Sequence, residues 1–151
     1  IVLENGPRTL SSALVVEIEA EFVALYKTQP LFGDIQRFMA ERGFVLHKFL
    51  DMAGRCFRPI RLPNPCQPMS QLLWADAIFV RDFGRLEAYG DDELLKAALI
   101  LTDVYGSFDL AAKLLIEHDR RTGGDIGAAY LRNLANLEVI PCQFLSQRLV
   151  P

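Results

Sequence analysis

An alternating stretch near the start of the chain constrains its fold most strongly. In LVVEIEAEF, which spans residues 14–22, apolar side chains alternate with glutamates. Because successive side chains of a strand point to opposite faces, this pattern predicts a strand with one apolar face and one face carrying Glu17, Glu19 and Glu21. Carboxylates held this close repel one another, and burial makes the repulsion worse. The acidic row therefore needs either a solvated face, or partners such as Arg37 or Arg42, or a function.

The following residues predict one helix and two more strands. Apolar residues at helical spacing in LFGDIQRFM predict a helix over residues 31–39, with Gly43 in the place of a C-terminal cap. Alternation predicts a strand over residues 44–50, with a possible continuation after a break at Gly54. A loop holding half of the chain's prolines comes next, because proline removes backbone donors and fixes φ. The last strand is predicted over residues 77–80, bounded by Asp76 and Arg81.

The pattern changes from strand-like to helical after Phe83. Three helical blocks follow, separated by YGS and TGGD, and acidic residues open the first of them, where the helix dipole favours negative charge. Asp109 is the expected cap of the second helix, and His118 is expected near its end. We therefore expect two parts: a β-α-β-β portion over residues 1–83 and a small all-α module over residues 84–151.

Composition narrows the class of protein. The chain has 151 residues, 51% of them hydrophobic and 23% charged, which is typical of a globular protein. A net charge of -3 offers no basic field for nucleic acid. Three cysteines without a CxxC pair argue against a disulfide framework and against a zinc site. The same cysteine pattern makes a reduced cytoplasm the expected location. The longest apolar run is interrupted by Lys96 and is too short to span a membrane, so we expect no membrane partner.

The first half of the chain resembles the C-terminal part of the FkbM family of S-adenosylmethionine-dependent methyltransferases. The resemblance rests on LENG, on ALVVEIEAEFVALYKTQPLFGDIQRFMAERGFVLHKFLD and on SQLLWADAIFVRD. The family's Tyr-x-x-Gln-Pro-Leu-Phe segment is matched by YKTQPLF, which starts at Tyr26, and its RGF turn by residues 42–44. The match covers about residues 1–83.

This resemblance implies an α/β fold, namely the C-terminal portion of a class I (Rossmann-like) methyltransferase sheet. The strand at residues 14–22 would be the fifth of seven, and the next two strands the sixth and the seventh, with the seventh antiparallel. The family's Gly-rich cofactor loop lies upstream, and no GxGxxG occurs here. We therefore expect S-adenosylmethionine as the cofactor of the intact enzyme and no cofactor for this chain alone. The opening IVLENGPRTL, which has no initiator Met, also reads as part of a longer protein.

The resemblance also suggests where the acidic row acts. Ligands of a doubly wound sheet bind beyond the carboxyl ends of its parallel strands, which Glu19 and Glu21 approach and which Tyr26 and Gln29 follow. A carboxylate there would accept the proton of a substrate hydroxyl as the methyl group moves. We expect Glu19 and Glu21 as catalytic residues, Tyr26 and Gln29 as substrate-binding residues, and no metal.

The expected activity is O-methyl transfer to a hydroxyl of a small molecule or sugar. The alternative is a non-catalytic protein-interaction module, in which the helical half binds a protein and the methyltransferase half is degenerate. Because the strand at residues 14–22 would be central in an intact sheet, we also expect self-association or a partner chain.

Overall fold

The computed structural model describes residues 3–136, which fall into two compact units, residues 1–85 and 86–151. Unit 1 is mixed α/β, and unit 2 is helical. The expected boundary lay between residues 83 and 84, and Cys142 lies outside the described residues.

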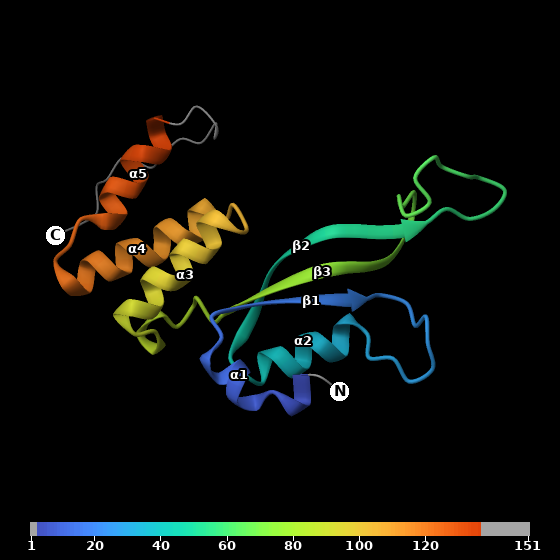
Figure 1. The fold of residues 1–151 in the computed structure, drawn as a ribbon, viewed down its shortest axis with the longest axis horizontal. Coiled ribbons are helices and arrows are strands. Elements are labelled where there is room, and N and C mark those ends of the chain that lie inside the picture. The colour runs from blue at the N-terminus through green and yellow to red at the C-terminus, as the bar shows by residue number, and fades with distance from the viewer. Residues whose placement is uncertain (1–2, 137–151) are drawn as a thin grey trace. The chain divides into compact units, whose positions relative to one another are not determined.

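Unit 1 begins with a short 3-10 helix, η1 (Leu3–Asn5), and helix α1 (Pro7–Ser12). Strand β1 (Val15–Glu21), helix α2 (Phe32–Ala40) and strands β2 (Phe44–Arg55) and β3 (Gln71–Arg81) follow. The strands form one sheet in the order β1-β3-β2, and β3 runs antiparallel to both neighbours, so β1 and β2 are parallel to each other (Figure 1). The antiparallel direction of the third strand is as expected.

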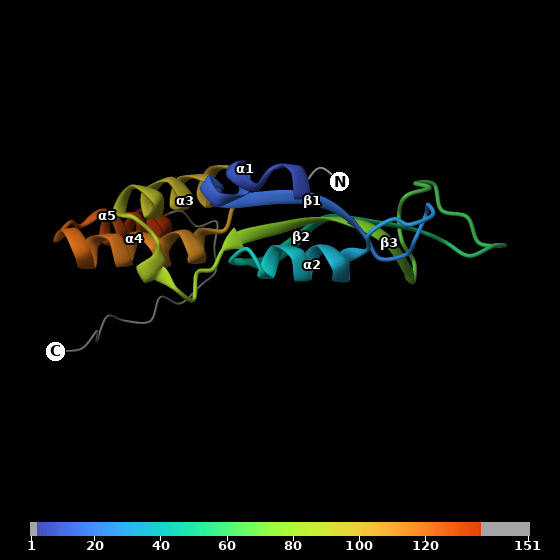
Figure 2. The same cartoon turned by 90° about the horizontal axis from the view of Figure 1, so that it is seen from below.

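The apolar side of β1 forms the core of unit 1 with α2. Ala20 packs with Ile35 and Met39 of α2 and with Phe79 of β3, all of them buried. Figure 2 shows α2 and α1 on opposite sides of β1. The alternation of residues 14–22 thus predicted both the strand and its buried side correctly.

Strand β2 differs from the sequence-based expectation. It runs through Gly54 without ending there, and its pairing with β3 shifts between Leu46 and Lys48 and again between Leu50 and Ala53. The first irregularity inserts His47 as an extra residue, so the side-chain alternation is out of phase beyond it. As a result Phe49, and not Lys48, joins Leu46 in contact with the core.

Unit 2 consists of a 3-10 turn, η2 (Leu86–Ala88), and helices α3 (Asp91–Asp103), α4 (Phe108–Thr122) and α5 (Ile126–Asn136). Helix α4 packs against both α3 and α5 through small and aliphatic side chains, with Leu94, Leu101 and Leu114 fully buried. The expected interruptions at YGS and TGGD are present, and Gly106 and Gly123 adopt positive φ there.

Two details of α4 correct the expectations. Ser107 occupies the N-cap position, so Asp109 lies inside the first turn and does not cap the helix. His118 is buried within α4 and does not end it, and its Nδ1 lies 3.7 Å from Oδ1 of Asp119. That carboxylate accepts hydrogen bonds from the backbone N–H groups of Ile126 and Gly127 at the start of α5.

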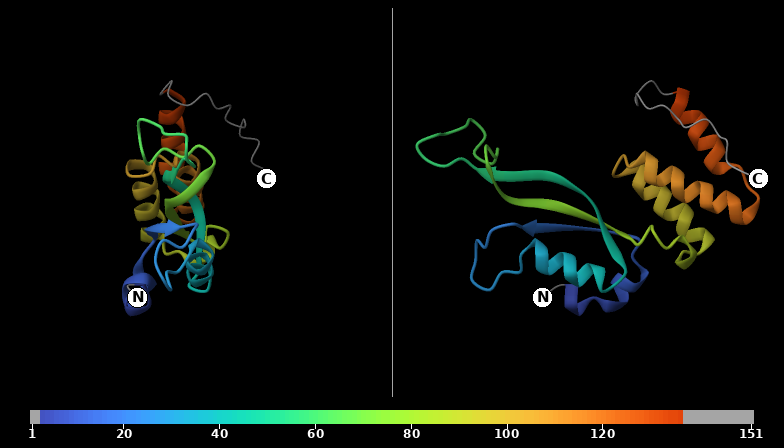
Figure 3. Two further views of the ribbon diagram at one scale, coloured as in Figure 1. Left: turned by 90° about the vertical axis from the view of Figure 1, so that its right-hand side faces the viewer. Right: turned by 180° about the vertical axis from the view of Figure 1, so that it is seen from behind.

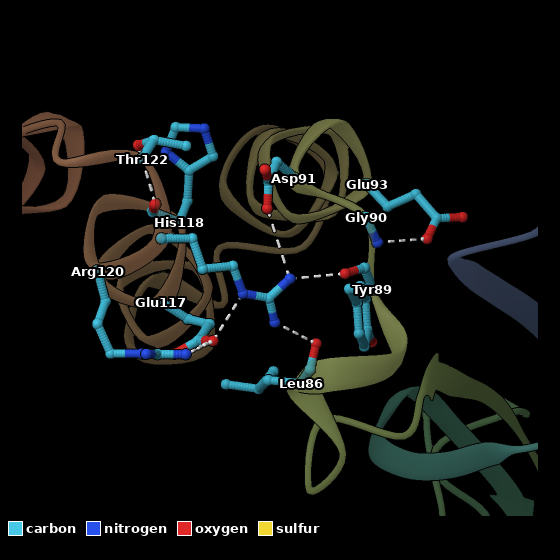
Figure 4. Close-up of polar contacts among 10 residues, drawn as sticks. Leu86, Tyr89, Gly90, Asp91, Glu93, Glu117, His118, Arg120 and Thr122 are labelled. Carbon is cyan, nitrogen blue, oxygen red and sulfur yellow. Dashed lines mark hydrogen bonds and ion pairs between the residues drawn. The ribbon is translucent and has the colours of Figure 1, made fainter.

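One arginine connects the two ends of the helical hairpin. Arg121 of α4 donates to the carbonyl oxygens of Leu86 and Tyr89, both at 2.7 Å, and to Glu117 at 2.7 Å (Figure 4). Glu117 also accepts two hydrogen bonds from Arg120, and the two arginines lower the pKa of its carboxyl group to about 2. This network fixes η2 and the start of α3 against the end of α4.

Candidate functional site

A groove lies along the outer edge of β1. A cavity of about 670 Å³ is lined by η1, β1, the loop after β1 and α2, and it includes Ile18, Glu19 and Glu21. Ile18 and Glu19 point to opposite faces of the strand, yet both line this cavity. The cavity therefore follows the strand edge and does not lie over one face of the sheet.

The hydrogen bonds to β3 show which backbone groups of β1 face this groove. The N–H of Arg81 donates to the carbonyl of Leu14 at 2.9 Å, and the N–H of Phe22 donates to that of Leu73 at 2.8 Å. Because antiparallel pairs alternate between bonded and non-bonded, the even-numbered residues of β1 bond to β3. The odd-numbered residues, which include Glu19 and Glu21, direct their N–H and C=O groups toward the outer edge.

The groove brings together part of the predicted site. Glu19, Glu21 and Gln29 all line it, whereas Tyr26 does not and has 74% of its surface exposed. Glu19 is exposed and Glu21 is half-buried. Within residues 3–136 neither carboxylate has a hydrogen bond or an ion pair, so both remain available to a ligand.

Gln29 organises the loop that follows β1. Its Oε1 accepts hydrogen bonds from the N–H groups of Leu25 at 3.0 Å and Tyr26 at 3.2 Å. The loop is anchored at both ends, because the rings of Phe22 and Phe32 lie 5.8 Å apart and both contact Phe49. The side-chain NH₂ of Gln29 is left as its donor toward a ligand.

Neither arginine suggested as a partner of the acidic row pairs with it. Arg37 forms an ion pair with Asp34 at 3.0 Å within α2. The guanidinium of Arg42 lies 3.4 Å from the centre of the Phe38 ring and donates to the Phe38 carbonyl. Because Arg37 also lines the groove, it supplies one cation among several carboxylates there.

Sequence reasoning missed Asp76 as part of this acidic face. It was expected to bound the last strand, but it lies inside β3, directly opposite Glu19. Partial burial raises the pKa of the Asp76 carboxyl group, and the charges of Glu17 and Asp51 raise it further. The sequence WADAIFV does show an aspartate next to an apolar run, but only the strand register shows that this aspartate faces Glu19.

The carboxyl ends of β1 and β2 lie at one end of the sheet. Two loops leave that end, residues 22–31 after β1 and residues 56–70 after β2 (Figure 3). Glu21 therefore lies at the carboxyl end of β1, and Tyr26 and Gln29 lie in the loop that leaves this end.

Among residues 3–136 no group of His, Cys, Asp or Glu side chains is arranged to hold a metal ion. In the same part of the chain no helix is both long and apolar enough to cross a membrane. Comparison with protein-family models, with curated proteins and with solved structures found no match.

Proposed function

We propose that this chain is the C-terminal segment of an S-adenosylmethionine-dependent methyltransferase of the FkbM type. The intact enzyme transfers a methyl group to a hydroxyl of a small molecule or sugar. The observation that carries the proposal is the position of Glu21, which is the last residue of a strand parallel to β2 and lines the same groove as Gln29 of the loop that follows. The antiparallel third strand agrees with the sheet that the resemblance implies.

The chemistry follows from the position of the carboxylates. When bound, S-adenosylmethionine would supply a methyl group on a sulfonium: the acceptor oxygen would attack the methyl carbon in line, the carbon–sulfur bond would break and the thioether would leave, so catalysis would consist largely of positioning. Glu19 or Glu21 accepts the proton of the acceptor hydroxyl, and the NH₂ of Gln29 donates a hydrogen bond to a neighbouring oxygen.

A further strand beside β1 would affect the two glutamates differently. If a further strand pairs with the outer edge of β1, it fills the groove beside Glu19 and leaves Glu21 open at the strand end. Glu19 acts as the base if the groove stays open in the enzyme, and Glu21 acts as the base if a strand fills it. Comparing the two residues therefore tests the mechanism and the arrangement of the sheet together.

The experiment measures methyl transfer by the full-length gene product from tritiated S-adenosylmethionine to a panel of sugars and hydroxylated small molecules. We expect Glu19→Gln or Glu21→Gln to lower kcat by about 10²-fold or more with unchanged cofactor affinity. Glu87→Gln makes the same chemical change at an exposed position of η2 and should leave kcat unchanged. Full turnover in both Glu19→Gln and Glu21→Gln would show that these glutamates have no catalytic role.

One observation favours the alternative, a protein-interaction module. Leu99 of α3 and Val104, which caps the C-terminus of α3, are 62% and 65% exposed and would offer a protein partner two apolar side chains. This alternative predicts that the full-length product neither binds S-adenosylmethionine nor transfers methyl groups. Isothermal titration with the cofactor distinguishes the two proposals before any acceptor is known.

A further inference from the structure

The loop between β2 and β3 differs in charge from the rest of the chain. Between Asp51 and Asp76 there is no acidic residue, while Arg55, Arg58 and Arg61 supply three positive charges in a chain of net charge -3. Segregation of cations in this way creates a local positive field that the net charge conceals.

The same loop exposes large apolar side chains. Phe57 is 68% exposed and Ile60 is 49% exposed, and Met69 near the end of the loop and Met52 near the end of β2 are more than half exposed. Phe57 and Ile60 alternate with cations in the sequence FRPIR. Phe57 and Ile60 belong to one turn, in which the N–H of Ile60 donates to the carbonyl of Phe57 at 3.1 Å, and exposed apolar side chains this close together indicate a contact surface, unlike apolar residues scattered singly over a protein.

Hydrogen bonds tie the second half of the loop to the end of β2. The N–H of Gly54 donates to the carbonyl of Cys66 at 2.9 Å, and Nη1 of Arg55 donates to the carbonyl of Pro65 at 2.6 Å. Arg55 is thus occupied at the base of the loop. Arg58 and Arg61 are exposed and make no hydrogen bond or ion pair with any residue of the described part of the chain.

We propose that this loop, residues 56–70, docks onto the surface of an anionic lipid bilayer. Arg58 and Arg61 contact headgroup phosphates, and Phe57 and Ile60 insert below them. The loop projects beyond the ends of the strands of unit 1 (Figure 1). A fluid bilayer adapts to a projecting point, whereas an acidic protein needs a matching concave surface. The proposal departs from the expectation of no membrane partner, which rested on the lack of an apolar run long enough to span a bilayer; surface docking does not require such a run.

The first test is sedimentation of the protein with lipid vesicles. We expect binding to phosphatidylcholine vesicles containing about a third phosphatidylserine, and little binding to phosphatidylcholine alone. Arg58→Gln with Arg61→Gln should weaken partitioning about tenfold or more, since each cation near the surface contributes about 1 kcal/mol. Arg8→Gln with Arg132→Gln changes the net charge equally at exposed positions elsewhere and should alter partitioning less than about twofold.

The second test follows the apolar part of the contact. Phe57→Trp, in a Trp74→Phe background, places the only indole of the chain in the loop, beside Arg58. We expect its fluorescence to shift to shorter wavelength and to be quenched by brominated lipid chains. Phe57→Ser with Ile60→Ser should weaken partitioning while its dependence on salt persists.

Three results would overturn the proposal. One is the absence of sedimentation with anionic vesicles, which would leave an acidic protein as the occupant of the loop. Another is that the Arg8 and Arg132 control weakens partitioning as much as the loop variant does, which would show that net charge, and not the loop, governs binding. The third is an unquenched indole in protein that sediments. None of these readouts involves methyl transfer, so the outcome is independent of the proposed enzyme.

Discussion

Glu19 of β1 and Asp76 of β3 lie directly opposite each other in a non-hydrogen-bonded pair of the sheet. In such pairs the Cα atoms approach to about 4.5 Å, and like charges are unfavourable. Burial raises the pKa of Asp76, and the charge of Glu17, two residues along β1 from Glu19, raises it further. Of these two carboxylates, Glu19 lines the groove, where a ligand would reach it, whereas Asp76 does not line the groove.

Asp76→Asn should stabilise the protein at neutral pH. A carboxyl group whose pKa is raised in the folded state binds its proton more tightly there, so its effect on stability becomes unfavourable as pH rises from the ordinary pKa through the raised one. We expect a gain of about 0.5 kcal/mol in the free energy of unfolding at pH 7. Urea unfolding at pH 7 and pH 3 checks this, because the gain should disappear at the lower pH.

Glu117 should produce the opposite dependence on pH. Its pKa is lowered from 4.5 to about 2 by hydrogen bonds from Arg120 and Arg121, so its stabilising effect is complete above pH 4.5 and disappears as pH falls to about 2. Glu117→Gln should destabilise unit 2 by about 1–2 kcal/mol at pH 7. Thermal unfolding at several pH values measures this, and an equal loss at pH 2 would show that the carboxylate charge is not involved.

The close packing of α5 on α4 depends on Gly127. A Cβ atom there would lie 2.8 Å from the backbone N of Ile116, too close for any real side chain. Gly127→Ala should therefore force the helices apart and destabilise the protein by about 1–3 kcal/mol. Gly33→Ala is the matched control, because its Cβ meets nothing within 4 Å inside α2, and it should be neutral or stabilising. Equal denaturation midpoints for the two variants would contradict this packing.

Local periodicity accounts for the parts of the fold that the sequence predicted. The alternation around Ala20 and the helical spacing around Ile35 and Leu114 each reflect one buried face, which any strand or helix must have. The bulge at His47 was not predictable, because an extra residue in a strand leaves no mark in the alternation before it.

The candidate site was predictable in part for the same reason. Glu19 and Glu21 could be assigned to one strand face from their spacing, and their place in a groove depends on α2, which packs beside them. Asp76 was misplaced because the residue it faces, Glu19, is distant in the sequence, and His118 because its burial depends on how α4 packs against α3 and α5. Periodicity specifies which side of an element is buried, and it does not specify what that side meets.

The isolated chain should not bind S-adenosylmethionine with useful affinity. A Gly-rich loop at the end of a first strand supplies the backbone contacts to such cofactors, and this sequence contains no GxGxxG. We expect no saturable heat at about millimolar cofactor in an isothermal titration, since binding that weak provides only about 4 kcal/mol. Saturable micromolar binding would show that residues within this chain form a complete cofactor site.

The outer edge of β1 should pair with another strand, and the glutamates should control that pairing. Among residues 3–136 no strand occupies this edge, toward which Glu19 and Glu21 direct backbone N–H and C=O groups. Such edges invite pairing with another chain. Antiparallel pairing of two copies about Glu19 would place the acidic rows opposite each other, which like charges disfavour.

We therefore expect weak, concentration-dependent association of the chain at pH 7. Glu19→Gln with Glu21→Gln removes two of the opposed charges from each copy and should strengthen the association by about tenfold, as measured by sedimentation equilibrium. Glu87→Gln with Asp103→Asn removes as much charge from unit 2 and serves as the control. If the control strengthens association equally, net charge and not the β1 edge governs it, and a strict monomer in every variant would exclude pairing through this edge.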